Sequence, residues 1–476
     1  MTLTVAIAAV LGGCFVSKVD PQKPELPLPD ALPAQAMQTS PLPNPWWTMF
    51  NDARLNELIV EALQHNPDAQ VAAARVMEAR SLLRITNADR LPTLNLEGDV
   101  TRTQQSMATL SNQGLGEIPG FRTQQTVYTV QGTVAYELDL WGKYQRASES
   151  ARAQLLNSEY GREATKLSLT GEVARTYYSL IAAAEQLARG RDTLKSREEA
   201  ADLEKLRYES GESDEFTYKR AEADAAATRV STRQLELQVV QLTNALGVLL
   251  GRSPKALVDE AISVQGISLP GPVQLPAALP SSVLSQRPDI GAAEAALNAS
   301  AADIGVARAQ LFPSISITGA LGSASPELDD LFTSPAKIWS ATGGILQPIF
   351  QGGRLRANVS RAEAVREQRK SEYARTVQQA FREVLDSLQG QALIAGVREA
   401  NDQQVAALTR ATELAELRYA QGDIAYLELL DVRRGLYQAQ IDLVAAQRDA
   451  LLNTVDLALA VGGGLGDQAE PLTAQR

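Results

Sequence analysis

Residue types that perform chemistry are scarce in this chain. Its 476 residues include one histidine and one cysteine, so the commonest general base is nearly absent and a zinc site has too few ligands. The most suggestive group is Arg287-Pro288-Asp289, in which a cation stands two residues from a carboxylate. A related stretch, Asn66-Pro67-Asp68, lacks the arginine, and we therefore interpret both as structural turns. We predict no catalytic residue, no metal site, no cofactor and hence no enzyme.

Charge and composition exclude further classes. The chain carries 45 basic and 56 acidic residues, for a formal net charge of −11. Nucleic-acid binding needs a basic surface that displaces counterions, so we expect no nucleic-acid partner. A single cysteine also excludes a framework of disulfide bonds.

That cysteine follows a short apolar run. Residues 5–11 are apolar, and two glycines separate them from Cys14. An apolar run that ends in small residues is typical of a secretory signal, and this run is too short to span a bilayer. Leu11-Gly12-Gly13-Cys14 resembles a bacterial lipobox, in which the cysteine is acylated and becomes the first residue. We predict a signal peptide at 1–13, lipid attachment (palmitate) at Cys14, and a proline-rich tether over residues 14–50.

The sequence after this tether contains an internal repeat. Three short motifs recur in the same order, each about 210–220 residues later in the chain: Asn66-Pro67-Asp68 as Arg287-Pro288-Asp289, Arg90-Leu91-Pro92-Thr93-Leu94 as Leu311-Phe312-Pro313-Ser314-Ile315, and Arg207-Tyr208-x-x-Gly211 as Arg418-Tyr419-x-x-Gly422. We therefore predict an internal duplication, with structural repeats at 51–270 and 271–464 and a C-terminal tail at 465–476.

Each repeat begins with a helix and two strands. In the first repeat we expect a helix from about Asp52 to Ala88. Apolar and polar residues then alternate with the period of two that marks strands with one apolar face. This alternation predicts strands at about 92–105, 124–138, 313–324 and 338–350, the last of which alternates less cleanly.

Each repeat ends in a long helical hairpin. Apolar residues recur at heptad spacing, which indicates helices packed nearly parallel in a coiled coil. The pattern predicts hairpins at about 145–250 and 355–461. Gly211 and Gly422 would end the first helix of each hairpin, with Ser213 or Asp214, and Asp423, placed to cap the second.

Four strands with one apolar face leave two interpretations open. In a soluble protein the sheet would pack on the hairpins. In an outer membrane the apolar face would meet lipid, and several copies would have to share one barrel because an open sheet edge is not tolerated in a bilayer. Periodicity alone does not decide between them.

Several motifs in fixed order carry a family resemblance: Asn66-Pro67-Asp68, Glu137-Leu-Asp-Leu-Trp-Gly142, Arg207-Tyr-x-x-Gly211, Gln286-Arg-Pro-Asp289, Ala309-x-Leu-Phe-Pro-Ser-Ile315 and Arg418-Tyr-x-x-Gly-x-x-x-Tyr-Leu-x-Leu-Leu-Asp431. Over residues 46–464 the chain resembles the TolC-like outer-membrane efflux family, and the lipobox resembles that of its lipoprotein (NodT/OprM-like) branch.

The resemblance implies an α+β membrane protein. Three copies would form a homotrimer in which the four strands of each protomer contribute to a shared twelve-stranded β-barrel in outer-membrane lipid. The coiled-coil hairpins would form a periplasmic α-barrel. The function implied is the passive exit duct of a tripartite efflux system, joined through a periplasmic adaptor to an inner-membrane pump of the resistance-nodulation-division type. The alternative is a periplasmic coiled-coil adaptor or a structural envelope lipoprotein.

A passive duct should close at rest, and the resemblance places its constriction at Leu427 and Asp431. These residues are one helical turn apart and share a face, so three-fold repetition would give an apolar ring and a carboxylate ring. Alternatively, Asp431 is a solvated residue that pairs with Arg433 or Arg434. The tips at Gly211 and Gly422 are expected to dock the adaptor, although a helix C-cap explains both glycines equally well.

Overall fold

The computed structural model describes residues 18–24, 43, 45–104, 106, 124–259, 262–264, 266–271, 273 and 286–463. The chain divides into two compact units. One, the sheet unit, comprises Met1–Pro24, Met77–Asn157 and Glu294–Glu372; the other, the hairpin unit, comprises Glu25–Val76, Ser158–Ala293 and Tyr373–Arg476. The predicted lipidation site Cys14 and the predicted tail 465–476 lie outside the described residues.

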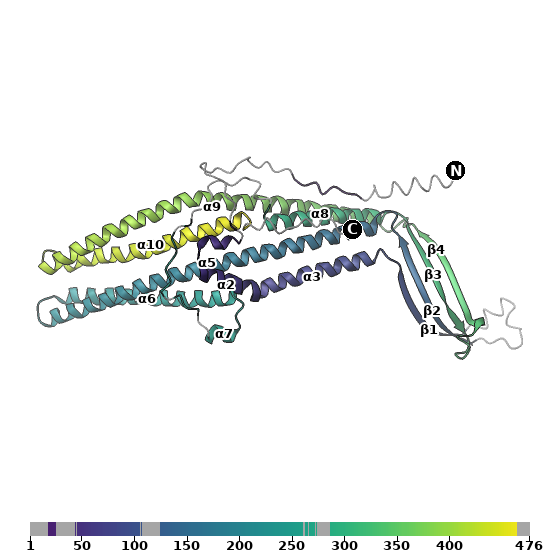
Figure 1. The fold of residues 1–476 in the computed structure, drawn as a ribbon, viewed down its shortest axis with the longest axis horizontal. Coiled ribbons are helices and arrows are strands. Elements are labelled where there is room, and N and C mark those ends of the chain that lie inside the picture. The colour runs from purple at the N-terminus through teal and green to yellow at the C-terminus, as the bar shows by residue number, and fades with distance from the viewer. Residues whose placement is uncertain are drawn as a thin grey trace. The chain divides into compact units, whose positions relative to one another are not determined.

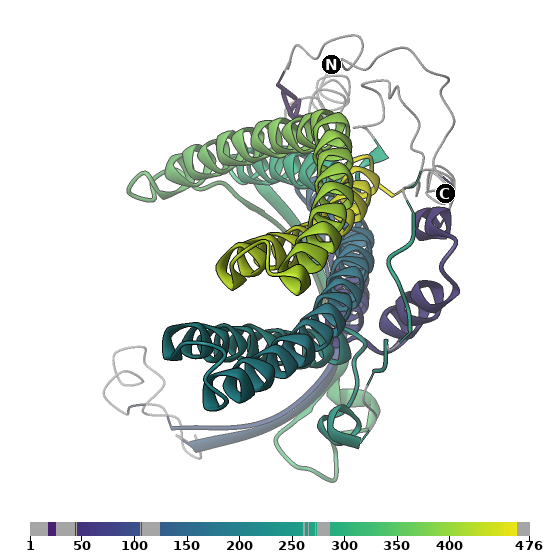
Figure 2. The ribbon, with the colours of Figure 1, turned by 90° about the vertical axis from the view of Figure 1, so that its left-hand side faces the viewer.

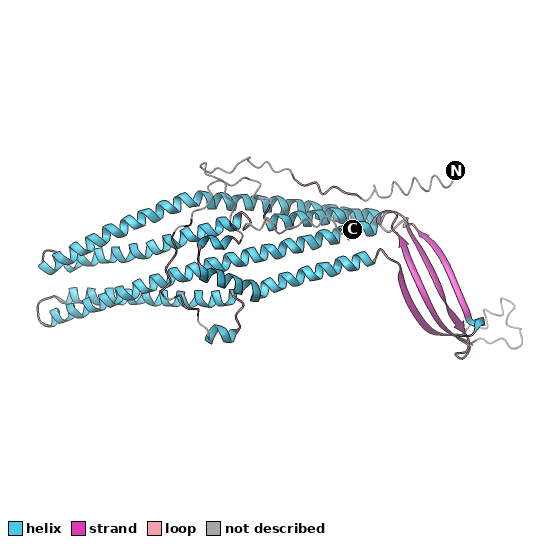
Figure 3. Ribbon diagram, in the orientation of Figure 1, coloured by secondary structure: helices cyan, strands magenta, loops and turns pink. Residues whose placement is uncertain are grey.

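The sheet unit contains four antiparallel strands in the order β1-β2-β3-β4, and Figure 3 draws the strands in magenta. They are β1 (Thr93–Gln104), β2 (Gln124–Leu138), β3 (Ser314–Ser325) and β4 (Lys337–Leu346). The first three lie within one residue of the ranges expected from the alternation. β4 ends four residues before its expected end, because Pro348 follows and has no N–H to donate to a ladder.

Pairing in the sheet separates an apolar face from a polar one. Leu321 lies opposite Gly132 on β2 and opposite Trp339 on β4, and Gly132 lies opposite Leu96 on β1. Leu96 and Trp339 on this face are 80% and 78% exposed. One position along, on the other face, Asn95 of β1 lies opposite Thr133 of β2. An apolar surface of this extent marks a face that meets lipid or a partner.

Two helical hairpins are the longest elements (Figure 1). The first joins α5 (Lys143–Glu209) to α6 (Glu215–Leu249), and the second joins α9 (Arg354–Gln421) to α10 (Tyr426–Ala460). Their bounds lie within two residues of those that the heptads predict. Among the described residues, no helix combines the length and the apolar character needed to cross a membrane.

The largest core lies in the hairpin unit. It packs α5 residues such as Tyr178 and Ile181 against Val455 of α10, the helix α2 (Ala53–His65) and the short 3-10 helix η1 (Trp46–Phe50). The indole of Trp46 is buried and donates to Thr170 Oγ1 at 3.3 Å. The last residues of the predicted 14–50 tether are therefore part of the folded body.

The prediction of a single helix from 52 to 88 is wrong. This segment forms two helices, α2 and α3 (Pro67–Ala88), which are separated by Asn66 in an extended conformation. The residue before a proline is disfavoured in the helical region, and here the Asn66 side chain caps α3 by accepting from the Asp68 N–H at 2.8 Å. The remaining helices of the described residues are α7 (Pro254–Asp259), α8 (Pro288–Ala309) and η3 (Ser334–Ala336).

Candidate functional site at the hairpin tips

The first helix of each hairpin ends at a glycine. Gly211 has φ +82° and Gly422 has φ +80°, a left-handed conformation that costs a glycine little. The next N–H reaches back to the helix in both hairpins, from Glu212 to Arg207 O at 2.8 Å and from Asp423 to Arg418 O at 2.9 Å. Both glycines are thus C-caps, while their predicted contact with an adaptor stays a prediction.

The second helix of each hairpin begins differently. Asp214 Oδ1 accepts from the Thr217 N–H at 2.7 Å and caps α6 as expected. At α10 the N-cap position is held by Ala425, which makes no side-chain cap, so the cap predicted at Asp423 is wrong. Asp423 directly follows Gly422, at the position that Glu212 has in the first hairpin. It therefore lies before the N-cap position of α10 and does not cap the first turn.

Leu427 and Asp431 lie in the first two turns of α10, and both are exposed. Because they are four residues apart, they share one face of the helix. Asp431 makes no ion pair within the described part of the chain. The two arginines considered as its partners are bound elsewhere: Arg433 Nη2 contacts Glu416 Oε1 at 2.7 Å, and Arg434 Nε contacts Asp224 Oδ1 at 2.7 Å.

The Arg434 contact joins the two hairpins. Asp224 lies on α6 with its side chain 2% exposed, and it also binds Arg197 of α5 at 3.2 Å. A buried carboxylate is stable only when paired and hydrogen-bonded, and here two guanidinium groups from different hairpins supply the pairing. Burial lowers the pKa of Arg197, and the nearby positive charge of Arg434 acts in the same direction, whereas Asp224 opposes both.

A second link joins α5 to α9. Glu204, also 2% exposed, accepts from the Tyr419 hydroxyl at 2.7 Å and from Arg207 Nη1 at 3.0 Å. Arg207 Nη1 also donates to the Tyr419 oxygen at 2.9 Å. Burial and the Glu204 carboxylate raise the pKa of Tyr419 to about 12. The phenol therefore stays protonated, and able to donate this hydrogen bond, at physiological pH.

These links were not predicted from the sequence. Figure 2 views the hairpins from their tips, with α5 and α6 beside α9 and α10. Asp224 of α6 binds Arg197 of α5 and Arg434 of α10, so it connects these three helices. A usable signal existed, because Asp224 falls on the same buried stripe of α6 as Ala221, Ala225 and Thr228. A charge at a buried heptad position indicates a specific partner across the interface.

Comparison with known proteins identifies the class of channel that has this architecture. The family model described as outer membrane efflux protein matches residues 58–252 and 279–463. The chain belongs to this family. The two matched segments fall one in each predicted repeat.

Relatives and solved structures agree with the family match. The chain is 32% identical over 467 residues to the "Probable outer membrane lipoprotein SilC" of Salmonella typhimurium, covering 97% of this chain and 98% of that protein. It is 34% identical over 474 residues to the toluene efflux pump outer membrane protein TtgC of Pseudomonas putida, with 98% and 96% covered. The crystal structure of the Campylobacter jejuni CmeC outer membrane channel superposes with a TM-score of 0.86 at 25% identity, with 94% and 95% covered.

The chain is therefore an outer-membrane efflux channel with the TolC-like α+β fold. Members of its family act in tripartite efflux systems with an adaptor and an inner-membrane pump. This finding favours the channel over the alternative weighed from the sequence, a periplasmic coiled-coil adaptor or a structural envelope lipoprotein. Family members are channel proteins rather than enzymes. Within the described ranges, no group of three or more potential ligand side chains could hold a metal ion.

Proposed function

We propose that this channel is a passive duct made of three copies of the chain and closed at rest by its hairpin tips. Leu427 and Asp431 would form an apolar ring and a carboxylate ring around the pore. The observation that carries the proposal is that Asp431 is exposed while its neighbours Arg433 and Arg434 bind other partners. The closed tip would then be held by the links of Arg434 to Asp224 and of Tyr419 to Glu204.

Unpaired edges support assembly from several copies. In the four-stranded order, β1 and β4 are outer strands of 12 and 10 residues, and long edges of this kind are normally covered. In the hairpin unit, α6 and α9 expose apolar residues at heptad spacing: Val230, Leu237 and Val248 on α6, and Leu393, Val397 and Leu414 on α9. Neighbouring copies would cover these strands and faces, and three copies would supply twelve strands.

The N-terminal segment fits a lipid tether. Lys23 Nζ contacts Glu294 Oε2 of α8 at 2.8 Å, and Val19 packs on the small cluster of Ile304, Ala307 and Ala362. These contacts hold residues 18–24, a few residues after Cys14, against α8 and its neighbours in the sheet unit. We propose acylation of Cys14, which would anchor the chain in outer-membrane lipid at about 0.8 kcal/mol per buried methylene.

The hairpin tips are the proposed adaptor-docking surface, at the turns of Gly211 and Gly422. We also propose that the pump is of the resistance-nodulation-division type, as the family resemblance implies. Both proposals concern the identity of partners, whereas the gate concerns this chain alone and can be tested without them.

Two neighbouring arginines give a matched test of the gate. Arg434→Ala removes the ion pair between hairpins but leaves Asp224 its bond to Arg197. Arg433→Ala removes an ion pair of similar length to Glu416, which lies within the second hairpin. We expect Arg434→Ala to admit large antibiotics into cells and to raise the open probability in planar bilayers about fivefold or more, with Arg433→Ala close to wild type. Equal behaviour of the two variants, or no opening by Arg434→Ala, would overturn the proposed gate.

A further inference from the structure

The two Pro-Asp motifs occupy equivalent places at the bases of the hairpins. Asn66 Nδ2 donates to the carbonyl oxygen of Leu249, the last residue of α6, at 2.9 Å. Arg287 Nη1 donates to the carbonyl oxygen of Ala460, the last residue of α10, also at 2.9 Å. Each motif therefore holds the end of the helix that returns from the tip.

The second motif does more than the first. The Arg287 side chain is 9% exposed, and it contacts both carboxylate oxygens of Asp289 at 3.0 and 2.8 Å and Glu383 Oε2 of α9 at 2.8 Å. It thus ties both helices of its hairpin, α9 and α10, to the start of α8. In the first repeat, the glutamate at the corresponding place on α5, Glu172, pairs with Arg175 instead.

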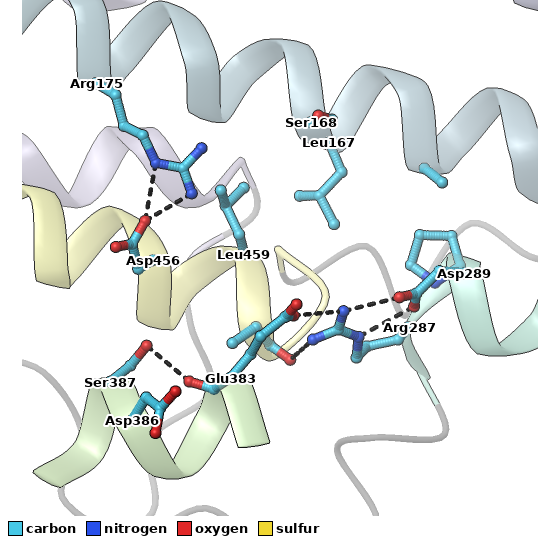
Figure 4. Close-up of a pocket in the computed structure, with 13 residues that line it drawn as sticks. Leu167, Ser168, Arg175, Arg287, Asp289, Glu383, Asp386, Ser387, Asp456 and Leu459 are labelled. Carbon is cyan, nitrogen blue, oxygen red and sulfur yellow. Dashed lines mark hydrogen bonds and ion pairs between the residues drawn. The ribbon is translucent and has the colours of Figure 1, made fainter. Parts of the chain in front are cut away.

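We call the contacts of Arg287 with Asp289, Glu383 and Ala460 the clamp. The side chains around this clamp are packed unevenly. A cavity of about 490 Å³ lies beside it, and its lining includes Leu167 of α5, Asp386 of α9 and Leu459 of α10 (Figure 4). Nearby, α5 and α10 approach so closely that a Cβ on Gly171 would lie 2.4 Å from a Leu459 methyl. Close-packed interiors resist tilting of their helices. Here the charged clamp, this tight contact and the ion pair of Arg175 with Asp456 border open space, which leaves room for a hairpin to tilt.

We propose that Arg287 is a positioning residue for the gate, the fixed point about which the second hairpin tilts as one body when the tips part. The proposal rests on the gate described above. Because Arg287 holds α9 and α10 together, motion of one helix is transmitted to the other. The length of α10 from Ala460 back to its first residue is about 50 Å, at a rise of about 1.5 Å per residue. A tilt of this helix by about 10° therefore moves its tip by about 9 Å.

The chain supplies its own replacement for the test. Arg287→Asn gives the second motif the residue that the first motif has, keeping a side chain that can donate to Ala460 while losing Glu383. Once α9 and α10 are no longer tied, we expect a closed state that is held less firmly. The open probability in planar bilayers should rise about fivefold or more, with the conductance of the fully open channel and the thermal unfolding temperature close to wild type. Arg382→Asn is the matched control, because Arg382 is an exposed neighbour that pairs with Asp386 on its own helix.

Glu383→Gln is a second variant that keeps the result decisive should Arg287→Asn not assemble. It removes only the negative charge on α9 that pairs with Arg287. The open probability should also rise, but by a smaller factor than in Arg287→Asn. Arg434→Ala in the same recordings reports on the gate itself. If Arg434→Ala opens the channel while the assembled clamp variants match wild type, the clamp proposal is wrong and the gate stands. If Arg434→Ala is also silent, the proposed gate is wrong as well.

Discussion

The two hairpins have the same arrangement of a long helix and a shorter return helix, yet their ends are secured differently. The first begins its return helix with a side-chain cap from Asp214, and its base is held by a neutral hydrogen bond from Asn66 together with the ion pair of Arg252 with Glu61. The second begins its return helix at Ala425 without a side-chain cap, and its base is held by the charged clamp of Arg287. The clearest difference lies at the tips, where only the first hairpin has a side-chain cap on its return helix.

This difference suits the second hairpin to moving at its tip. The proposed gate residues Leu427 and Asp431 lie just after the uncapped start of α10, where helix ends fray most readily. The base of the same hairpin is where a fixed point would be needed. The first hairpin would then serve as the frame, with Asp224 as the buried carboxylate that receives Arg434 from the moving partner.

Removing the Asp224 carboxylate is expected to have the largest effect on the stability and closure of the channel. Asp224→Ala leaves Arg197, which is largely buried, without its counter-charge, and breaking a buried pair from one side costs about 3–5 kcal/mol. We expect a clear fall in the thermal unfolding temperature, followed by far-UV circular dichroism, and a channel that no longer closes. Asp442→Ala is the control, because Asp442 is an exposed acid of α10 that accepts from Gln438. An unfolding temperature equal to that of the control would contradict the role of Asp224 as frame.

Exchanging the caps should have a smaller effect. Ala425→Asp gives α10 the cap that α6 has, which is worth about 1 kcal/mol. If fraying at this tip helps the gate to open, the open probability should fall by a factor of about five. Asp214→Ala makes the reverse change in the first hairpin and should lower the stability of its tip. A channel whose open probability is unaffected by Ala425→Asp would show that capping does not govern the second tip.

Regular patterns made much of the fold predictable. Alternation placed β2 at its observed bounds, and the heptads placed both hairpins within two residues, because these periodicities report directly on which face is apolar. The break at Asn66 was missed although the sequence carried a signal for it, because asparagine favours the N-cap and proline the first position of a new helix. The uncapped start of α10 was missed because the acidic residue near it, Asp423, belongs to the preceding turn.

The site was less predictable than the fold. Leu427 and Asp431 could be named from a motif, but the function of Arg434 could not, because an aspartate three residues away offered a local partner. The observed partner, Asp224, is 210 residues away in the chain. Pairing at that distance is decided by how the hairpins pack, and the sequence marks only that a charge occupies a buried position.

The most direct test of the proposed gate is single-channel recording of purified wild type and Asp431→Ala in planar bilayers. We expect a small, rarely open wild-type channel and a variant that opens wider and prefers cations less, because the proposed ring of three carboxylates would be absent from the variant. Wild-type conductance and unchanged ion preference in the variant would contradict a gate at this position. The absence of any channel, from wild-type protein shown to be intact and trimeric, would contradict the duct itself.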